Sequence, residues 1–118
     1  MFHKVLLPID LSAPESWRRA LPAALEVLGE GGELHVATVM PDFGMSVVGS
    51  YFESGFEERP LHELGETLAD WVTANVPAGV DVHPHVLHGT VYDQIIVAAD
   101  RLEADAIVMG SHRPELKD

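Results

Sequence analysis

Apolar and polar residues recur along the chain with strand-like and helix-like spacings that alternate. Apolar runs of strand length occur at residues 5–9 and 106–109, and residues 34–39 also read as a strand. Such runs are typical of strands buried on both faces, as in a parallel sheet. Residues 80–87 alternate instead, which predicts a strand with one wetter face. Because Pro84 has no N–H to donate to a neighbour, we expect this strand at an edge of the sheet.

A helix is predicted after the first strand. Ser12 and Glu15 have the spacing of a capping box, with Ser12 as the N-cap, and Pro14 falls in the first turn. The glycine-rich residues 29–32 are expected to end this helix. Pro22 would lie inside it and remove one backbone hydrogen bond, which predicts a bend.

Two further helices are expected. Residues 61–76 form an amphipathic pattern whose buried face includes Leu68 and either Trp71 or Val72. Thr90 resembles an N-cap with an acid three residues later. The buried face of the helix that follows is predicted to carry Ile95, Ile96, Ala99 and Leu102.

Residues 41–60 are rich in Gly, Ser and aromatic side chains and show no sustained period. A loop of this length in a compact domain is usually mobile or functional, and it could fold over a ligand. The alternative is a plain surface connection between two elements.

The predicted order is β-α-β-α-β-α-β, in one domain spanning residues 1–118. Alternation of this kind indicates an α/β fold with an open, parallel, doubly wound sheet and right-handed crossovers. With 118 residues, 47% of them apolar, the chain can fill one hydrophobic core.

The charge balance limits the partners. Nineteen acidic and seven basic side chains give a formal net charge of −12, which repels phosphodiester backbones and anionic headgroups. We therefore expect neither nucleic acid nor a membrane surface as a partner. The absence of cysteine excludes thiolate chemistry, and the first residues do not resemble a secretory signal. A cytoplasmic location is expected.

Candidate binding residues follow the first and last predicted strands. Asp10 either binds a ligand through its carboxylate or serves as a local turn residue. Pro8 in a buried strand indicates a bulge or a ligand-facing gap. Gly110 and Ser111 either let backbone N–H groups approach a phosphate or make an ordinary turn. The carboxyl ends of parallel strands border ligand crevices, so we expect these residues to converge.

Other motifs were weighed against this crevice. His83, His85 and His88 suggest a metal site, but no acid or thiol completes the set nearby in the sequence, so no metal is expected. The chain has no nucleophile elbow and no P-loop motif, which argues against an α/β-hydrolase and a P-loop enzyme. No catalytic residue is assigned.

Three motifs resemble the universal stress protein family over essentially the whole chain. The family has Pro-x-Asp at the end of the first strand, matched by Pro8-Ile9-Asp10. It has His-Val in the second strand, matched by His35-Val36, and Met-Gly-Ser-His after the fourth, matched by Met109 to His112. The resemblance implies a Rossmann-like fold of the adenine nucleotide alpha hydrolase type, with strand order 3-2-1-4 and the family's usual fifth strand missing here.

The same resemblance implies ATP or AMP as the ligand, with Mg²⁺ as its companion ion. It assigns adenine and ribose to Asp10 and Val36, and the phosphates to the segment from Met109 through Gly110, Ser111 and His112. The family's phosphate loop has a second glycine where this chain has Arg113, and its far half lies beyond Asp118. The Gly-Ser-His-Arg-Pro sequence resembles a branch of the family that replaces that glycine, and Arg113 would substitute a charged contact for backbone contacts.

The leading hypothesis is an adenine-nucleotide-binding regulatory protein of the stress response, acting on an unidentified protein partner. The alternative is an interaction module of the same fold that works without nucleotide. A slow ATPase or phosphotransferase ranks last, because no general base or nucleophile can be named. A homodimer or higher oligomer is expected, because residues 106–109 would otherwise leave an apolar sheet edge unprotected.

Overall fold

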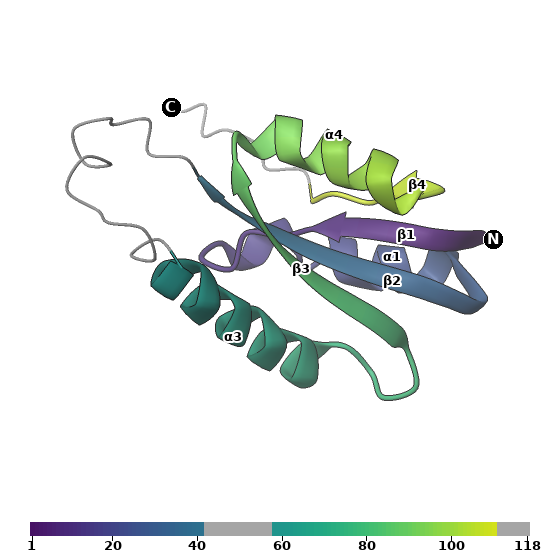
Figure 1. Ribbon diagram of the computed structural model, residues 1–118. Coiled ribbons are helices and arrows are strands. Elements are labelled where there is room, and N and C mark those ends of the chain that lie inside the picture. The colour runs from purple at the N-terminus through teal and green to yellow at the C-terminus, as the bar shows by residue number, and fades with distance from the viewer. Residues whose placement is uncertain (42–57, 111–118) are drawn as a thin grey trace, which may run out of the picture.

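The computed structural model describes residues 1–41 and 58–110. Along the chain the elements are β1 (Phe2–Pro8), a 3₁₀ turn (Pro14–Ser16), α1 (Ala20–Val27), β2 (Leu28–Pro41), α3 (Glu58–Asn75), β3 (Asp81–Gly89), α4 (Val91–Leu102) and β4 (Ala106–Ile107). Figure 1 shows them as a sheet between layers of helices. The alternation of strands and helices predicted from the sequence is confirmed.

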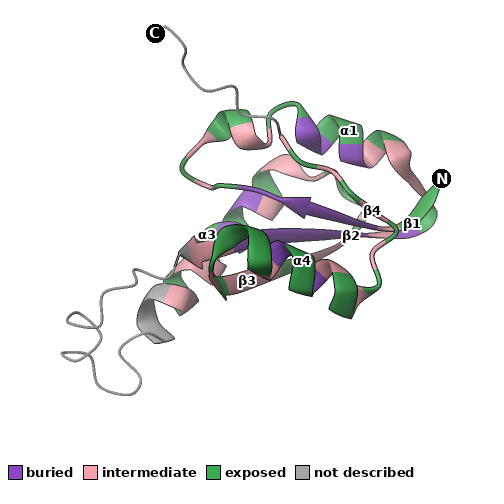
Figure 2. Cartoon of the chain, turned by 90° about the horizontal axis from the view of Figure 1, so that it is seen from above, coloured by how far each residue is buried: buried purple, intermediate pink, exposed green. Residues whose placement is uncertain are grey.

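The sheet is parallel and has the strand order β3-β2-β1-β4. The predicted order 3-2-1-4 is therefore confirmed, and β3, which contains Pro84, lies at an edge as expected. Helices α1 and α3 pack on one face of the sheet and α4 on the other (Figures 1 and 2). The α/β fold class is the one that the sequence predicted.

Two apolar clusters hold the layers together, because successive strand residues point to opposite faces. The cluster under α1 and α3 contains Val5, Leu7, Ile9, Ala20, Leu21, Ala24, Leu34, Val36, Leu68 and Trp71. The cluster under α4 contains Leu6, Ala37, Ile95 and Ala98. The central strands β1 and β2 supply both clusters, which is why their buried residues are apolar on both faces apart from His35 and Thr38 (Figure 2).

The predicted capping box is wrong. Ser12 cannot cap a helix, because its hydroxyl donates to Asp10 Oδ1 at 2.7 Å. A short 3₁₀ turn follows, and the α-helix begins only at Ala20. Pro22 consequently falls in the first turn of α1, where a missing N–H costs least, and not in the middle of a longer helix.

The ends of two strands also differ from the prediction. β2 begins at Leu28, so the glycines expected to form a turn at 29–32 lie within the strand, where its register against β1 shifts. β4 has two residues in place of the four expected, although the Val108 N–H still donates to the carbonyl of Leu6.

The structure shows which residues form the buried faces of α3 and α4. In α3 the buried residue is Trp71, while Val72 is only partly buried. In α4, Ile95 and Ala98 face the sheet, whereas Ile96 is 64% exposed and its predicted burial is wrong. Ile95 and Ala98 are three residues apart and share a face, and Ile96 is turned about 100° away from Ile95 around the helix axis.

Of the predicted loop 41–60, residues 58–60 belong to α3, and residues 42–57 lie outside the described part of the chain. Within the described ranges, none of the helices combines the length and apolar character needed to span a bilayer.

Candidate functional site

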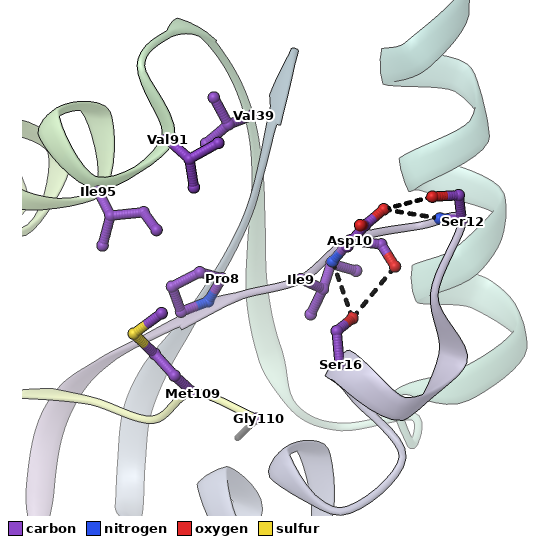
Figure 3. A pocket seen from close by; sticks show the side chains of 10 residues that line it. All are labelled: Pro8, Ile9, Asp10, Ser12, Ser16, Val39, Val91, Ile95, Met109 and Gly110. Carbon is purple, nitrogen blue, oxygen red and sulfur yellow. Dashed lines mark hydrogen bonds between the residues drawn. The ribbon is translucent and has the colours of Figure 1, made fainter. Parts of the chain in front are cut away.

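A pocket lies at the carboxyl ends of β1 and β4 and has a volume of about 360 Å³. Such strand ends border the ligand crevice in open α/β sheets. Its lining residues, drawn in Figure 3, are Pro8, Ile9, Asp10, Ser12, Ser16, Val39, Val91, Ile95, Met109 and Gly110. The structure therefore brings four of the predicted site residues, Pro8, Asp10, Met109 and Gly110, to one cavity.

Asp10 is exposed at the end of β1 and closes a local turn. Its Oδ1 accepts hydrogen bonds from the N–H and hydroxyl of Ser12, at 3.0 and 2.7 Å. Its backbone N–H donates to Ser16 Oγ at 2.9 Å, and that hydroxyl donates to the Asp10 carbonyl at 3.1 Å (Figure 3). Oδ2 accepts no hydrogen bond from the described residues. Asp10 thus fills the turn role, and that role uses only one of its two carboxylate oxygens.

Gly110 packs its backbone directly against the 3₁₀ turn. A Cβ built at this position would overlap the carbonyl of Ser16 and lie 3.1 Å from the Ser16 Cα. Only glycine permits this approach, because the obstructing atoms are backbone and cannot rotate away. Since Ser16 is hydrogen-bonded to Asp10, the two strand ends are joined through this turn.

Pro8 and Met109 contribute apolar lining. Pro8 is buried as the last residue of β1, so its missing N–H falls where the ladder ends at the pocket. Of the two sequence interpretations, a bulge or a gap that faces a ligand, the second is the one that a position at the pocket favours. Met109, which follows β4, is 47% exposed, and its side chain lies beside Pro8 (Figure 3).

The structure does not bring Val36 to the pocket. Val36 is fully buried in the core under α1 and α3, five residues before the end of β2. Val39 lies near the strand end and lines the pocket instead. The His-Val pair at 35–36 matches the family motif by letters but falls in the middle of a strand that extends to Pro41. The sequence placed the end of this strand at Val39, and that position was the signal for which valine lines the pocket.

A second hollow of about 430 Å³ adjoins the first and opens towards α3. The two hollows share Asp10, Ser12 and Val39, which form the wall between them. Sequence reasoning missed Ser12, Ser16 and Val39 as lining residues. The signal available for the two serines was their position in the segment that joins the first strand to the helix after it.

The amino terminus of α4 also reaches the pocket, through Val91 and Ile95. Thr90, the N-cap residue, makes no side-chain cap hydrogen bond. The first N–H groups of a helix and its dipole favour an anion at such a position. No Lys, Arg or His is among the residues that line the pocket within the described ranges, so its one charged side chain is Asp10.

Three predicted site residues, Ser111, His112 and Arg113, lie outside the described residues. Gly110 is the last described residue, and it lines the pocket.

A comparison with models of known families matches residues 1–118 to the model for the universal stress protein family. The chain belongs to the universal stress protein family. Universal stress protein G of Shigella flexneri is 26% identical to it over 118 residues, which cover 98% of this chain and 83% of that protein. The membership implied by the three sequence motifs is confirmed.

Solved structures resemble this universal stress protein in fold. The hypothetical protein MJ0577 superimposes with a TM-score of 0.76 at 21% identity, covering 98% of this chain and 79% of that one. Protein Rv1636 from Mycobacterium tuberculosis H37Rv gives a TM-score of 0.64 at 20% identity, covering 94% and 72%. Both confirm the parallel α/β architecture.

Proposed function

We propose that this universal stress protein is a cytoplasmic regulatory protein that binds ATP or AMP at the ends of β1 and β4. The observation that carries the proposal is that Asp10 and Gly110, distant in sequence, line one cavity at the carboxyl edge of the sheet. Its volume, about 360 Å³, is within the usual range for small-molecule sites. Apolar walls with a few convergent polar groups suit a nucleoside.

The arrangement of polar groups supports one orientation. Asp10 Oδ2 is placed to accept a hydrogen bond from a ribose hydroxyl or an adenine amino group near Val39. The phosphates would then extend towards the backbone of Gly110 and the amino terminus of α4. Since the protein carries a net charge of −12, Mg²⁺ is expected to accompany ATP and reduce the repulsion.

The test is calorimetric titration of the full chain with ATP–Mg²⁺ and with AMP. We expect one site per chain, and an Asp10→Ala variant should bind roughly 10–100-fold more weakly, because it loses a charged hydrogen-bond acceptor. Absence of binding with both nucleotides, or an Asp10→Ala variant that binds like the parent, would contradict the proposal.

Asp10→Ala also removes a turn, so a second variant separates binding from folding. Val91→Trp places a large side chain at the pocket opening, on a residue that is 40% exposed and can accept it without disturbing the core. Val97→Trp is the matched control, because Val97 lies on the same helix with the same 40% exposure but does not line this pocket. Nucleotide binding should be lost in Val91→Trp and kept in Val97→Trp.

A nucleotide-independent interaction module remains a second candidate, favoured by exposed apolar side chains on α4 and after it. These are Val91, Tyr92, Ile96, Val97, Ile107 and Met109. They would serve a homo-oligomer or a protein partner. Sedimentation with and without ATP distinguishes the two functions. An oligomeric state that is the same with and without ATP favours the interaction module. An oligomeric state that changes when ATP is added favours the regulatory protein.

A further inference from the structure

Two neighbouring strands carry the same acid-x-His pattern in register. Glu33 of β2 pairs with Asp81 of β3, and His35 pairs with His83 two residues later. Residues two apart in a strand point to the same face, so the parallel register sets two carboxylates and two imidazoles side by side. The sequence did not reveal this group, because its halves are separated by nearly fifty residues.

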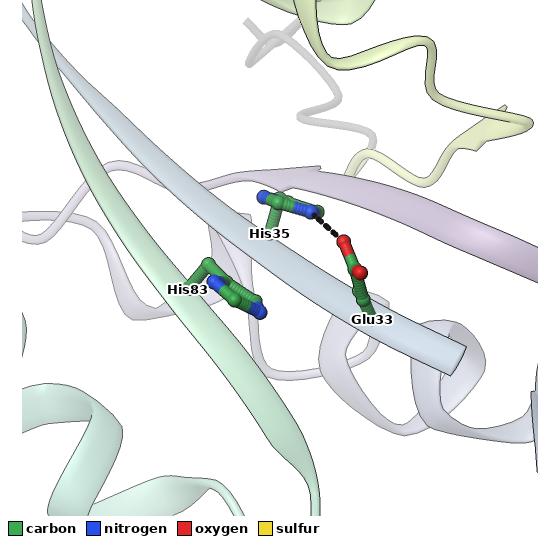
Figure 4. Close-up of side chains that lie close together, drawn as sticks. All are labelled: Glu33, His35 and His83. Atoms are coloured by element: carbon green, nitrogen blue, oxygen red, sulfur yellow. Dashed lines mark hydrogen bonds and ion pairs between the residues drawn. The ribbon is translucent and has the colours of Figure 1, made fainter. Parts of the chain in front are cut away.

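The side chains of this array lie close together (Figure 4). His35 Nε2 is 2.9 Å from Glu33 Oε1. One donor atom from each of Glu33, His35 and His83 can be chosen so that all lie within 4.8 Å of one another. In a tetrahedral zinc site, with metal–ligand bonds of about 2.0–2.1 Å, the donor atoms are about 3.3 Å apart. Closing that difference requires a rotation of the His83 side chain.

His83 Nε2 is the least satisfied atom of the group. The atom is buried and has no hydrogen-bond partner among the described residues, although the ring itself is partly exposed. Asp81 Oδ1 lies 3.0 Å away, but not in hydrogen-bond geometry. Because this contact is an ion pair with an exposed carboxylate and not a hydrogen bond, His83 Nε2 stays available to another ligand.

We infer that Glu33, His35 and His83 form a site for a divalent late first-row transition metal, of which Zn²⁺ is the representative. Two neutral imidazoles and one carboxylate are a donor set that suits such an ion, and a water molecule can supply the fourth ligand. His35 is buried and oriented through its second nitrogen, since its Nδ1 lies 2.8 Å from His85 Nε2. Such a contact fixes the orientation of a metal-binding imidazole.

Metal binding requires one rearrangement. The rings of His35 and His83 are stacked, with centroids 4.7 Å apart and planes 19° from parallel. Because the lone pairs of an imidazole lie in the ring plane, both rings cannot point at one ion in this arrangement. His83, whose side chain is 42% exposed on an edge strand, is free to turn towards the buried His35.

The site is separate from the nucleotide pocket. Its ligands lie at the start of β3 and four or more residues before Val39 on β2, which is about 13 Å along the strand. None of the three ligands lines either hollow at the carboxyl edge. The inference therefore does not depend on nucleotide binding.

The test is calorimetric titration of the full, untagged chain with Zn²⁺ at neutral pH, in the absence of nucleotide. We expect one ion per chain, and Glu33→Gln and His83→Ala should each weaken binding by at least about 10-fold. Both side chains are partly exposed, so these variants should fold, and circular dichroism verifies it.

His88→Ala is the matched control. His88 is on the same strand as His83, but an odd number of residues away, and therefore on the opposite face. Its affinity for Zn²⁺ should equal that of the parent. Absence of Zn²⁺ binding by the parent, full affinity in both Glu33→Gln and His83→Ala, or equal loss in His88→Ala and His83→Ala would overturn the inference.

Discussion

Gly110 couples the geometry of the pocket to the packing of the 3₁₀ turn. Its backbone occupies the space where a Cβ would meet the carbonyl of Ser16, and Ser16 in turn bonds to Asp10. Any side chain at position 110 therefore moves the strand end away from Asp10. The Ser16 backbone atoms that exclude a side chain at position 110 therefore also set how closely the end of β4 approaches Asp10.

Gly110→Ala should lower the free energy of unfolding by about 1–3 kcal/mol, the usual cost of overpacking against atoms that cannot rotate away. Gly65→Ala is the matched control. Gly65 lies within helix α3, and a Cβ there would contact only Val86 Cγ2, at 3.7 Å. That change should raise the free energy of unfolding by about 0.5–1 kcal/mol. Urea denaturation followed by circular dichroism measures both, and a neutral Gly110→Ala would show that the turn is not packed as described.

Single residues show how far the sequence predicts the site. Asp10 and Gly110 could be placed because each directly follows an apolar run, and the ends of parallel strands share one edge. Val36 could not be separated from Val39 by motif letters, since only the observed end of β2 decides which valine reaches the pocket. The Glu33–His83 group was missed because strand register is a property of the folded sheet.

Elements were predicted best where periodicity alone decides them. The runs in β1 and β2, the alternation in β3 and the amphipathic faces of α3 and α4 correspond to observed elements. The element ends were less predictable, because local hydrogen bonds compete for the same side chains. Ser12, which donates to Asp10 and so does not cap a helix, is the clearest case.

Helix α3 packs on the sheet through Leu68 and Trp71. This ring is 7% exposed and meets Trp17 edge to face, with centroids 5.3 Å apart. Trp71→Ala should cost about 3–5 kcal/mol of unfolding free energy. Thr73→Ala, an exposed position two residues further along the same helix, should change stability by no more than about 0.5 kcal/mol. Chemical denaturation of the two variants checks the contrast, and similar losses would contradict it.

The start of β4 is tied to β1 by a carboxylate. Asp105 Oδ2 accepts the backbone N–H groups of His3 and Lys4, at 2.8 and 2.9 Å. The Lys4 and His3 N–H donors hold the pKa of the Asp105 carboxyl below its ordinary value of 3.8. A lowered pKa in the folded state means that ionised Asp105 stabilises the fold above about pH 4. This contribution is lost as the pH falls through the folded-state pKa.

Asp105→Asn should therefore be less stable than the parent at neutral pH, and the difference should shrink as the solution is acidified below the ordinary pKa. Thermal unfolding of both proteins across this pH range is the measurement. Asp93→Asn serves as the control, since no described hydrogen bond of that side chain links it to another element. A difference between parent and Asp105→Asn that stays constant with pH would contradict the role assigned to the carboxylate.

At the scale of the whole molecule, the net charge opposes association between copies of the chain, whereas the exposed apolar residues favour it. A net charge of −12 keeps copies apart, whereas Tyr92 and Ile96, 72% and 64% exposed one turn apart on α4, favour contact. β4 adds an edge that pairs only with β1 in the described part of the sheet. Association through α4 and β4 would bury these side chains without covering α1 or α3.

We accordingly expect the chain to form a dimer or higher oligomer, with a mass that is a multiple of 12.8 kDa. Ile96→Glu places a charge in the proposed contact and should shift the population towards the monomer, because burying an unpaired carboxylate is costly. Thr73→Glu adds the same charge on α3, outside the contact, and should leave the oligomer intact. Light scattering after size exclusion, at matched salt, measures all three proteins. A parent that elutes only as a 12.8 kDa species, or equal dissociation of the two variants, would exclude α4 as the interface.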